Sequence, residues 1–178
     1  MEKIGVFLSS KTHIAPELAE ATLELGRWLG REGKTLVYGG SRAGQMERLA
    51  AAVKENGGRV FGVVPQAIVD RDLVSEHIDV EFRCAVLADR KEIMLRESDA
   101  FVALPGGIGT LDEVFTVVAA HTFGLHAKPT ILYDVAGFWD PLIRTLDAMK
   151  EQGFITGDFS QRLTVAHSFG ELTDWLSR

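Results

Sequence analysis

The stretch Ala100-Phe-Val-Ala-Leu-Pro-Gly-Gly-Ile-Gly-Thr-Leu-Asp-Glu113 contains the transition that decides the fold. Its first five residues are apolar throughout, as expected of a strand that is buried on both faces of a sheet. Pro105 and three glycines then interrupt the pattern, and the residues after them have helical spacing. A strand, a glycine turn and a helix in direct succession are typical of an α/β protein with a parallel sheet.

The same alternation runs along the rest of the chain. Further apolar runs predict strands at Lys3–Leu8, Thr35–Tyr38, Val60–Val64 and Thr130–Tyr133, with Gln161–Ala166 as a candidate for a last one. Helical spacing is found at Pro16–Arg31, Ala43–Glu55, Val86–Glu97, Thr110–Leu125, Trp139–Gln152 and Phe169–Trp175. Right-handed crossovers would place these helices on both faces of the sheet. We therefore predict a single Rossmann-like, doubly wound α/β domain over residues 1–178.

One stretch, Pro65–Arg83, has no regular pattern and is dense in charge. An irregular segment of that length in a compact domain is either functional or contains structure that the pattern does not reveal.

Composition and charge narrow the class of protein. The chain has 178 residues, of which 46% are hydrophobic and 25% charged, as in ordinary soluble globular proteins. Its net charge of −6 disfavours nucleic acid as a partner, and no apolar run is long enough to span a membrane. Cys84 is the only cysteine, so an internal disulfide is excluded. We expect a cytoplasmic protein without nucleic-acid or membrane partners.

Ligands of doubly wound sheets bind beyond the carboxyl ends of the strands. The segments there are Ser9-Ser10, Gly39-Gly40-Ser41, Pro65-Gln66, Pro105–Thr110 and Asp134, and two of them are rich in glycine. Glycines let a ligand approach the main chain, and the free N–H groups of a following helix favour an anion. The turn at 105–110 is therefore predicted to bind a phosphate, with a tight turn that holds no ligand as the alternative.

Glu113 is open to two interpretations. Thr110-Leu-Asp-Glu113 fits a capping box, in which Thr110 caps the helix and Glu113 reaches back to it. A catalytic role for Glu113 competes with that structural role. If Asp112 and Glu113 both lie in the first helical turn, they would repel a phosphate there unless a cation neutralises them.

Arg90 can supply that cation. It shares a helical stripe with apolar residues and should face the core, where an arginine needs a carboxylate or phosphate partner. An ion pair with Asp89 or Glu97 is the alternative. Lys91 lies about 100° further round the helix, so we expect it to be solvated.

The Arg90-Lys91 pair and the glycine turn together resemble a known family. Arg90-Lys91, the run Ser98–Leu104 and the segment Pro105–Glu113 are similar to the LOG family of cytokinin riboside 5′-monophosphate phosphoribohydrolases, which have often been mislabelled lysine decarboxylases. The family hallmark is an Arg-Lys pair followed by PGGxGTxxE, and both halves are intact. The resemblance covers roughly residues 3 to 155 and includes Gly124–Pro129, Gly137–Asp140 and Glu151–Ile155.

The resemblance implies hydrolysis of the N-glycosidic bond of an adenosine-type nucleoside 5′-monophosphate, N6-substituted (cytokinin) forms included. It also implies a homodimer with active sites near the subunit interface, and no metal or organic cofactor. Arg90 and Glu113 would be the catalytic pair. The other implied contacts to substrate or phosphate are Ser9, Gly39, Gly40, Lys91, Gly106, Gly107, Ile108, Gly109, Thr110 and Asp112. The five histidines show no zinc-type spacing.

The chain departs from the family pattern mainly after its second strand. Tyr-Gly-Gly-Gly and Gly-Leu-Met-Gly of the family are Tyr38–Ser41 and Gly44–Glu47 here, and Ala120 and Thr122 replace a Trp and a Gln. Because these positions flank the nucleotide in the family, the preferred base stays open. A nucleotide-binding or carrier protein without catalysis is the alternative function. A dinucleotide-dependent oxidoreductase is disfavoured, because Asp112 stands where that fingerprint has its third glycine.

The helix predicted at Thr110–Leu125 is apolar on nearly every side. Such a helix must be buried on most faces. Either a second subunit covers it, or it is a central helix of the core.

Overall fold

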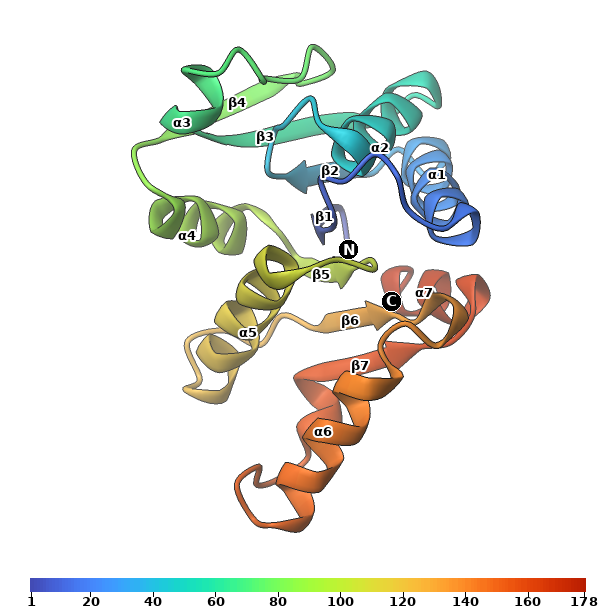
Figure 1. The fold of residues 1–178 in the computed structure, drawn as a ribbon, viewed down its shortest axis with the longest axis vertical. Helices are drawn as coiled ribbons and strands as arrows, with labels where there is room; N and C mark the ends of the chain where they lie inside the picture. The colour runs from blue at the N-terminus through green and yellow to red at the C-terminus, as the bar shows by residue number, and fades with distance from the viewer.

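The computed structural model describes all 178 residues and contains one parallel sheet of seven strands (Figure 1). The strand order is β4-β3-β2-β1-β5-β6-β7, and every neighbouring pair is parallel. The strands are β1 (Lys3–Phe7), β2 (Thr35–Tyr38), β3 (Arg59–Pro65), β4 (Val80–Cys84), β5 (Ala100–Ala103), β6 (Thr130–Tyr133) and β7 (Leu163–Ala166).

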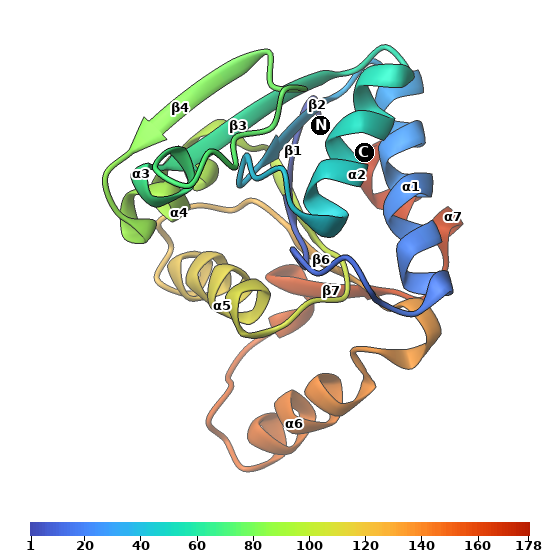
Figure 2. The same cartoon turned by 45° about the horizontal axis from the view of Figure 1, so that its top comes forward.

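Helices cover both faces of this sheet (Figure 2). On one face lie α1 (Pro16–Arg31), α2 (Gly44–Glu55) and α7 (Phe169–Leu176), and on the other α4 (Leu87–Glu97), α5 (Ile108–Thr122) and α6 (Asp140–Glu151). A short helix, α3 (Gln66–Val69), follows β3, and two 3₁₀ turns lie at Val135–Gly137 and Phe159–Gln161. The predicted doubly wound α/β architecture is confirmed.

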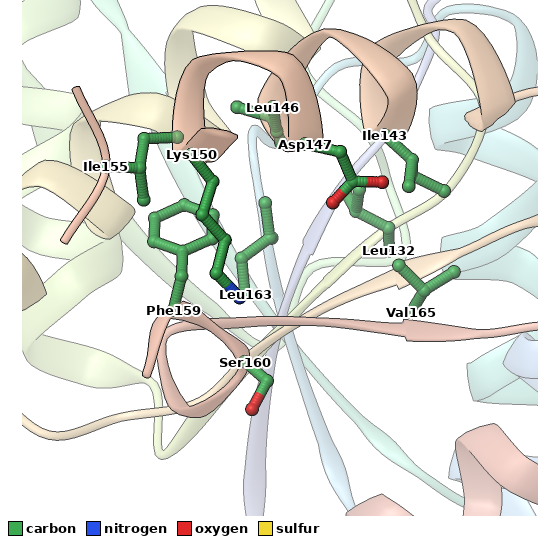
Figure 3. Close-up of a pocket in the computed structure, with 10 residues that line it drawn as sticks. All are labelled: Leu132, Ile143, Leu146, Asp147, Lys150, Ile155, Phe159, Ser160, Leu163 and Val165. Atoms are coloured by element: carbon green, nitrogen blue, oxygen red, sulfur yellow. The ribbon is translucent and has the colours of Figure 1, made fainter. Parts of the chain in front are cut away.

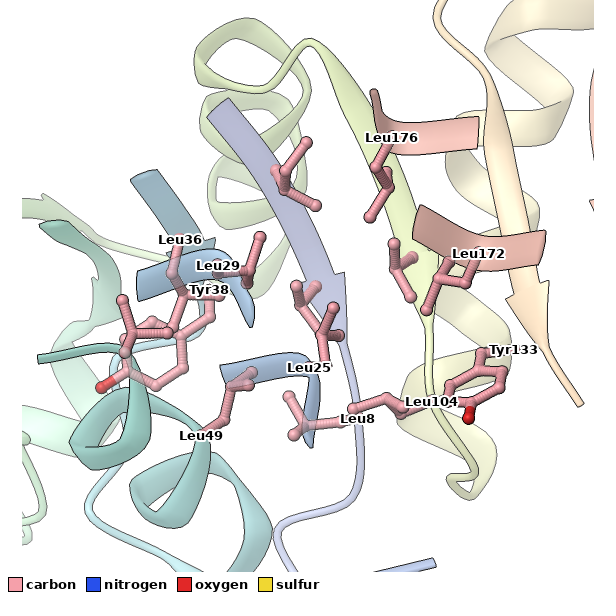
Figure 4. Packing of buried hydrophobic residues seen from close by; sticks show 14 of the residues in the cluster. Leu8, Leu25, Leu29, Leu36, Tyr38, Leu49, Leu104, Tyr133, Leu172 and Leu176 are labelled. Atoms are coloured by element: carbon pink, nitrogen blue, oxygen red, sulfur yellow. The ribbon is translucent and has the colours of Figure 1, made fainter. Parts of the chain in front are cut away.

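Two hydrophobic layers hold the helices to the sheet. Leu25 and Leu29 of α1 and Leu49 of α2 are fully buried in the first layer, which Figure 4 shows together with the leucines of α7. The second layer lies under α4, α5 and α6 and contains Met94 and Val114. The strands other than β4 supply both layers, because successive side chains point to opposite faces.

The irregular stretch after β3 contains structure that the sequence pattern did not reveal. It includes α3 and β4, the strand at one edge of the sheet. In β4, half-buried Val80 and Phe82 alternate with exposed Glu81 and Arg83. An edge strand with one solvated face lacks the continuous apolar run by which the other parallel strands are found.

The topology also positions a ligand site. Strand order reverses between β1 and β5, and a crevice at the carboxyl ends of such strands is the usual binding place in doubly wound sheets. No helix is both long and apolar enough to cross a membrane.

Candidate active site

A cavity of about 490 Å³ lies at this reversal point. Its walls come from the segments that follow β1, β2, β3 and β5, and from α4. The lining residues are Leu8, Ser9, Ser10, Lys11, Ser41, Ala43, Met46, Ile68, Arg71, Leu73, Arg90, Gly107, Ile108, Gly109, Thr110 and Glu113.

An ion pair between Arg90 and Glu113 forms one wall of the cavity. Arg90 Nη2 donates a hydrogen bond to Glu113 Oε1, and the two side chains are only 17% and 9% exposed. Gly39 makes room for the guanidinium, since a Cβ there would lie 2.8 Å from Arg90 Cζ. The pair joins α4 to α5, so Arg90 has the carboxylate partner that its apolar stripe requires. The alternative pairs with Asp89 or Glu97 do not form.

Burial raises the pKa of the Glu113 carboxyl above its ordinary value, and the neighbouring Arg90 guanidinium limits that rise. The charge of Asp112 acts in the same direction as burial. Glu113 Oε1 is engaged by Arg90, whereas Oε2 has no hydrogen-bond partner in the protein. A carboxylate with one oxygen held and one oxygen free beside a cavity is suited to orient a water molecule or to stabilise positive charge.

The capping-box interpretation of Glu113 is wrong. Helix α5 begins at Ile108 with Gly107 as its N-cap, two residues before Thr110, and its first turn contains no acid. Glu113 therefore lies in the second turn and points to Arg90 rather than to the helix end. The expected repulsion of a phosphate by first-turn acids disappears for the same reason.

Lys91 and Asp112 form a second ion pair beside the first. Lys91 Nζ lies 2.8 and 2.9 Å from the two carboxyl oxygens of Asp112. The Lys91 side chain is 20% exposed, so the expectation that it is solvated is wrong. The two pairs cross from α4 to α5 side by side and fix the position of α5 at the cavity.

The N-terminus of α5 supplies an anion site. Gly107, Ile108, Gly109 and Thr110 line the cavity, and the first N–H groups of a helix have no partner within it. No protein atom lies within 4 Å of the place where a Cβ would stand at Gly107 or Gly109. The backbone is therefore open to a ligand, and the helix dipole favours a negative charge. Gly106 differs, since a Cβ there would collide with the side chain of Thr110.

Comparison with known proteins assigns the chain to a family. The sequence model of the family described as "Possible lysine decarboxylase" matches residues 46–176, which carry both ion pairs and the glycine turn. The cytokinin riboside 5′-monophosphate phosphoribohydrolase LOG of Oryza sativa subsp. japonica is 35% identical over 96% of this chain and 70% of its own length. The relative LOG7 of Arabidopsis thaliana, with the same enzyme name, is 37% identical over 87% of this chain and 71% of its own. The chain belongs to the LOG family.

Solved structures agree with this fold. A Moco carrier protein from Chlamydomonas reinhardtii superposes with a TM-score of 0.73 at 25% identity, over 99% of this chain and 95% of its own. A molybdenum cofactor binding protein from Rippkaea orientalis has a TM-score of 0.74 at 22% identity, over 99% and 95% of the two chains. These two solved structures with this fold are thus named as carrier or cofactor-binding proteins, whereas the sequence relatives are named as enzymes.

The structure brings together some of the predicted LOG-family contacts and leaves others outside the cavity. Arg90, Glu113, Ser9 and the four residues Gly107–Thr110 line it. Gly39, Gly40, Lys91, Gly106 and Asp112 do not, and they pack behind or beside the lining.

Sequence reasoning missed two cations of the cavity wall, Lys11 and Arg71, together with the apolar side chains of Ile68 and Leu73. A signal for both cations was present. Lys11 directly follows the candidate segment Ser9-Ser10, and Arg71 lies in the charge-dense stretch after β3.

A second, smaller cavity of about 150 Å³ lies between α6 and β7 (Figure 3). Its lining is mostly apolar, and Asp147 and Lys150 of α6 are its only charged residues. It contains no residue of the Arg90–Glu113 site. No group of three or more His, Cys, Asp or Glu side chains in the protein is arranged to hold a metal ion.

Proposed function

We propose that this protein hydrolyses the N-glycosidic bond of an adenosine-type nucleoside 5′-monophosphate, N6-substituted forms included. The products are the free base and ribose 5-phosphate. This proposal rests on the position of Glu113. One of its carboxyl oxygens is bonded to Arg90 and the other is free, and the residue lines the same cavity as the open N-terminus of α5. The names of the curated relatives support the same reaction.

The two parts of the site have complementary tasks. The N–H groups and dipole of α5 bind the 5′-phosphate at Gly107–Thr110, which places the ribose near Glu113. As the bond from C1′ to the base nitrogen breaks, its electron pair leaves with the base and C1′ becomes oxocarbenium-like. The ionised Glu113 stabilises this positive charge. It also accepts a proton from the water whose oxygen bonds to C1′. The departing base nitrogen takes up a proton from solvent, and Glu113 then returns its proton to solvent, so that one water is consumed in all.

Arg90 is the residue that keeps Glu113 in position. Its hydrogen bond to Oε1 fixes the carboxyl group and leaves Oε2 for the water. Its positive charge opposes the effect of burial on the pKa of Glu113 and so favours the ionised carboxylate.

A screen of nucleoside 5′-monophosphates tests the proposal. AMP, an N6-substituted AMP, GMP, CMP and UMP are incubated with the protein, and free base is measured by chromatography. Adenosine, which lacks the phosphate, is incubated as a control. We expect base release from the adenine nucleotides and little from adenosine. Release of no base from any monophosphate would refute the proposed reaction.

A carrier that binds a nucleotide-like ligand without cleaving it is the second candidate. The similarity to a solved Moco carrier protein favours it. A carrier would be stabilised against heat by the nucleotide, and it would release no base over hours. The same screen, combined with melting curves, therefore separates the two functions.

We also propose that a second copy of the chain covers α5. Ile108, Leu111, Phe115 and Ala119 form a stripe along a shallow hollow on this helix, and Ile108 is 83% exposed. Exposed Val86 and Leu87 lie at the start of the neighbouring α4. An apolar stripe on a single helix is self-complementary in a two-fold dimer. Since Ile108 also lines the cavity, the partner would close the active site on that side.

Light scattering coupled to gel filtration tests the homodimer. We expect Phe115→Asp to produce monomers, because it places a charge in the centre of the stripe. Phe154→Asp is the matched control, since Phe154 is 80% exposed but lies beyond α6. A wild-type monomer, or a Phe115→Asp dimer, would refute this assembly.

The domain organisation and the cellular compartment are part of the same proposal. Residues 1–178 would act as one nucleotide-binding unit, because the cavity takes its walls from segments between Leu8 and Glu113 and the sheet extends to β7. The cytoplasm is the proposed compartment, supported by the buried free thiol of Cys84. Fractionation with an antibody against the chain tests this location.

A further inference from the structure

The cavity has an unusual composition for a nucleotide site, because none of its lining residues is aromatic. Proteins commonly bind a nucleobase by stacking a flat group on its face, either an aromatic ring or an arginine guanidinium. Two arginines line the cavity, Arg71 and Arg90. Arg90 is held by Glu113, so Arg71 carries the only flat group that is free to stack.

The Arg71 side chain forms no ion pair and no hydrogen bond, although acids flank it on both sides. Asp70 accepts a hydrogen bond of 2.8 Å from Gln66 Nε2, and the Asp72 carboxylate lies 3.7 Å from Arg42 Nη2. Each neighbouring acid is thus engaged by another residue. The guanidinium of Arg71 remains available to a ligand.

The backbone that presents Arg71 is well defined. Asp72 N–H bonds to Val69 O and Leu73 N–H bonds to Ile68 O, which together form a Schellman motif at the end of α3. Asp72 has a φ of 53°, a left-handed conformation that costs an aspartate some strain. This turn puts Ile68, Arg71 and Leu73 on one wall.

The same wall is tied to the turn after β2. Arg42 N–H donates to Leu73 O at 2.7 Å, and Ser75 N–H donates to Gly40 O at 3.0 Å. Arg42 Nη2 also donates to Asp72 O at 2.8 Å. Ile68, Arg71 and Leu73 therefore form an anchored surface, with two apolar side chains beside one flat cation.

This wall lies at the opposite end of the cavity from the anion site. The wall follows β3 and the anion site follows β5, and β2 and β1 lie between them in the sheet. With neighbouring strands about 4.8 Å apart, the two ends are separated by roughly 14 Å. A nucleoside monophosphate that is bound by its phosphate at α5 would extend its base toward Arg71.

We propose that Arg71 stacks on the base of the nucleotide and, with Ile68 and Leu73, determines which base the site accepts. This inference rests on the proposed nucleotide function and adds an orientation to it. Lys11 also lines the cavity without an ion pair, and its carbonyl lies against Gly44 and Gln45 after β2.

Calorimetric titration with AMP and with ribose 5-phosphate, which lacks the base, tests this orientation. The Glu113→Gln background prevents turnover, and Arg71→Ala and Arg71→Lys are introduced into it. We expect Arg71→Ala to weaken AMP binding by about 5- to 30-fold, the range for a cation on a π face, and to leave ribose 5-phosphate unchanged. Arg71→Lys should not restore AMP binding, because it keeps the charge and loses the plane.

Three results would overturn the inference. They are unchanged AMP affinity in Arg71→Ala, equal weakening of both ligands in that variant, and recovery of AMP affinity in Arg71→Lys, which would indicate that the charge of residue 71, and not stacking, binds AMP. Failure of AMP to bind the Glu113→Gln background would overturn it as well. The proposed function is judged separately, by base release from the wild-type protein, so a failure of one is distinguishable from a failure of the other. Melting curves confirm that all variants are folded.

Discussion

Two glycine turns follow parallel strands in this protein, one after β5 at 105–110 and one after β2 at 39–44. In the first, Gly107 and Gly109 have open space at their Cα atoms, and that space belongs to the ligand cavity. In the second, the corresponding space is filled by the protein itself. A Cβ at Gly39 would strike Arg90, and one at Gly44 would collide with the backbone carbonyls of Ser10 and Lys11.

The difference shows that a glycine-rich turn can serve a ligand directly or through the structure around it. The turn after β2 supports the site from behind. Gly39 gives Arg90 its place, and Gln45 Nε2 donates to the carbonyls of Lys11 and Thr12 at 3.3 and 3.4 Å. The β1–α1 segment, which carries Ser9 and Lys11 into the cavity, is therefore held by the second turn. We expect substitutions in the first turn to weaken substrate binding without loss of stability, and substitutions in the second turn to lower stability or kcat.

The largest effect is expected at the catalytic carboxylate beside the first turn. Glu113→Gln keeps an acceptor for the Arg90 hydrogen bond but removes the negative charge and the base, so kcat should fall by about 10²- to 10⁴-fold. The melting temperature should change little. Initial rates of base release measure the effect. Glu92→Gln, an exposed change on α4, is the matched control, and wild-type turnover in Glu113→Gln would leave the carboxylate without a catalytic role.

The next largest effect is a loss of stability in the second turn. Gly44→Ala should lower the free energy of unfolding by about 2–4 kcal/mol, because φ is 49° and the new Cβ meets backbone carbonyls that cannot move independently. Urea denaturation measures it. Gly33→Ala is the control for strain alone, since φ is 63° there and no atom lies within 4 Å. Its cost should be only about 1–2 kcal/mol, and equal costs at the two positions would contradict the collision argument.

The pH dependence of the reaction follows from the raised pKa of Glu113. The ionised carboxylate is the active form, so kcat/KM should fall on the acid side, about tenfold per pH unit once the pH is below that pKa. The midpoint should lie above the ordinary range of a glutamate. A pH–rate profile between pH 4 and 8 measures it, and a midpoint at or below the value of a free glutamate would indicate that burial does not control this group.

The smallest effects are expected at Gly109, inside the first turn of α5. Gly109→Ala should raise stability by about 0.5–1 kcal/mol, because alanine loses less entropy than glycine in a helix and its Cβ meets no protein atom. The same Cβ occupies the path of the phosphate, so KM should rise by a factor on the order of ten while kcat is retained. Gly39→Ala should instead lower kcat, because it displaces Arg90. The same change in KM and kcat in the two variants would contradict the distinction between the two turns.

Much of the fold was predictable from the sequence because buried strands and amphipathic helices are local patterns. The alternation of apolar runs and helical spacing indicated the doubly wound sheet. Among the strands, only the edge strand β4 escaped, since its charged and apolar residues alternate, and the short helix α3 before it escaped as well. The family motif likewise identified Arg90, Glu113 and the glycine turn as residues that belong together.

Other features depended on which elements meet in space. Local reasoning offered Glu113 a capping box as one of two interpretations, whereas α5 begins two residues earlier and directs the carboxylate across to Arg90, 23 positions away in the chain. Arg71 and Lys11 reach one cavity only because β3 and β1 end at the same edge of the sheet. The sequence by itself determined most of the helices and strands and the chemistry of the motif, since both depend on residues that are close together in the chain. The tertiary structure decided which glycines face a ligand and which face the protein, because that depends on neighbours from distant parts of the chain.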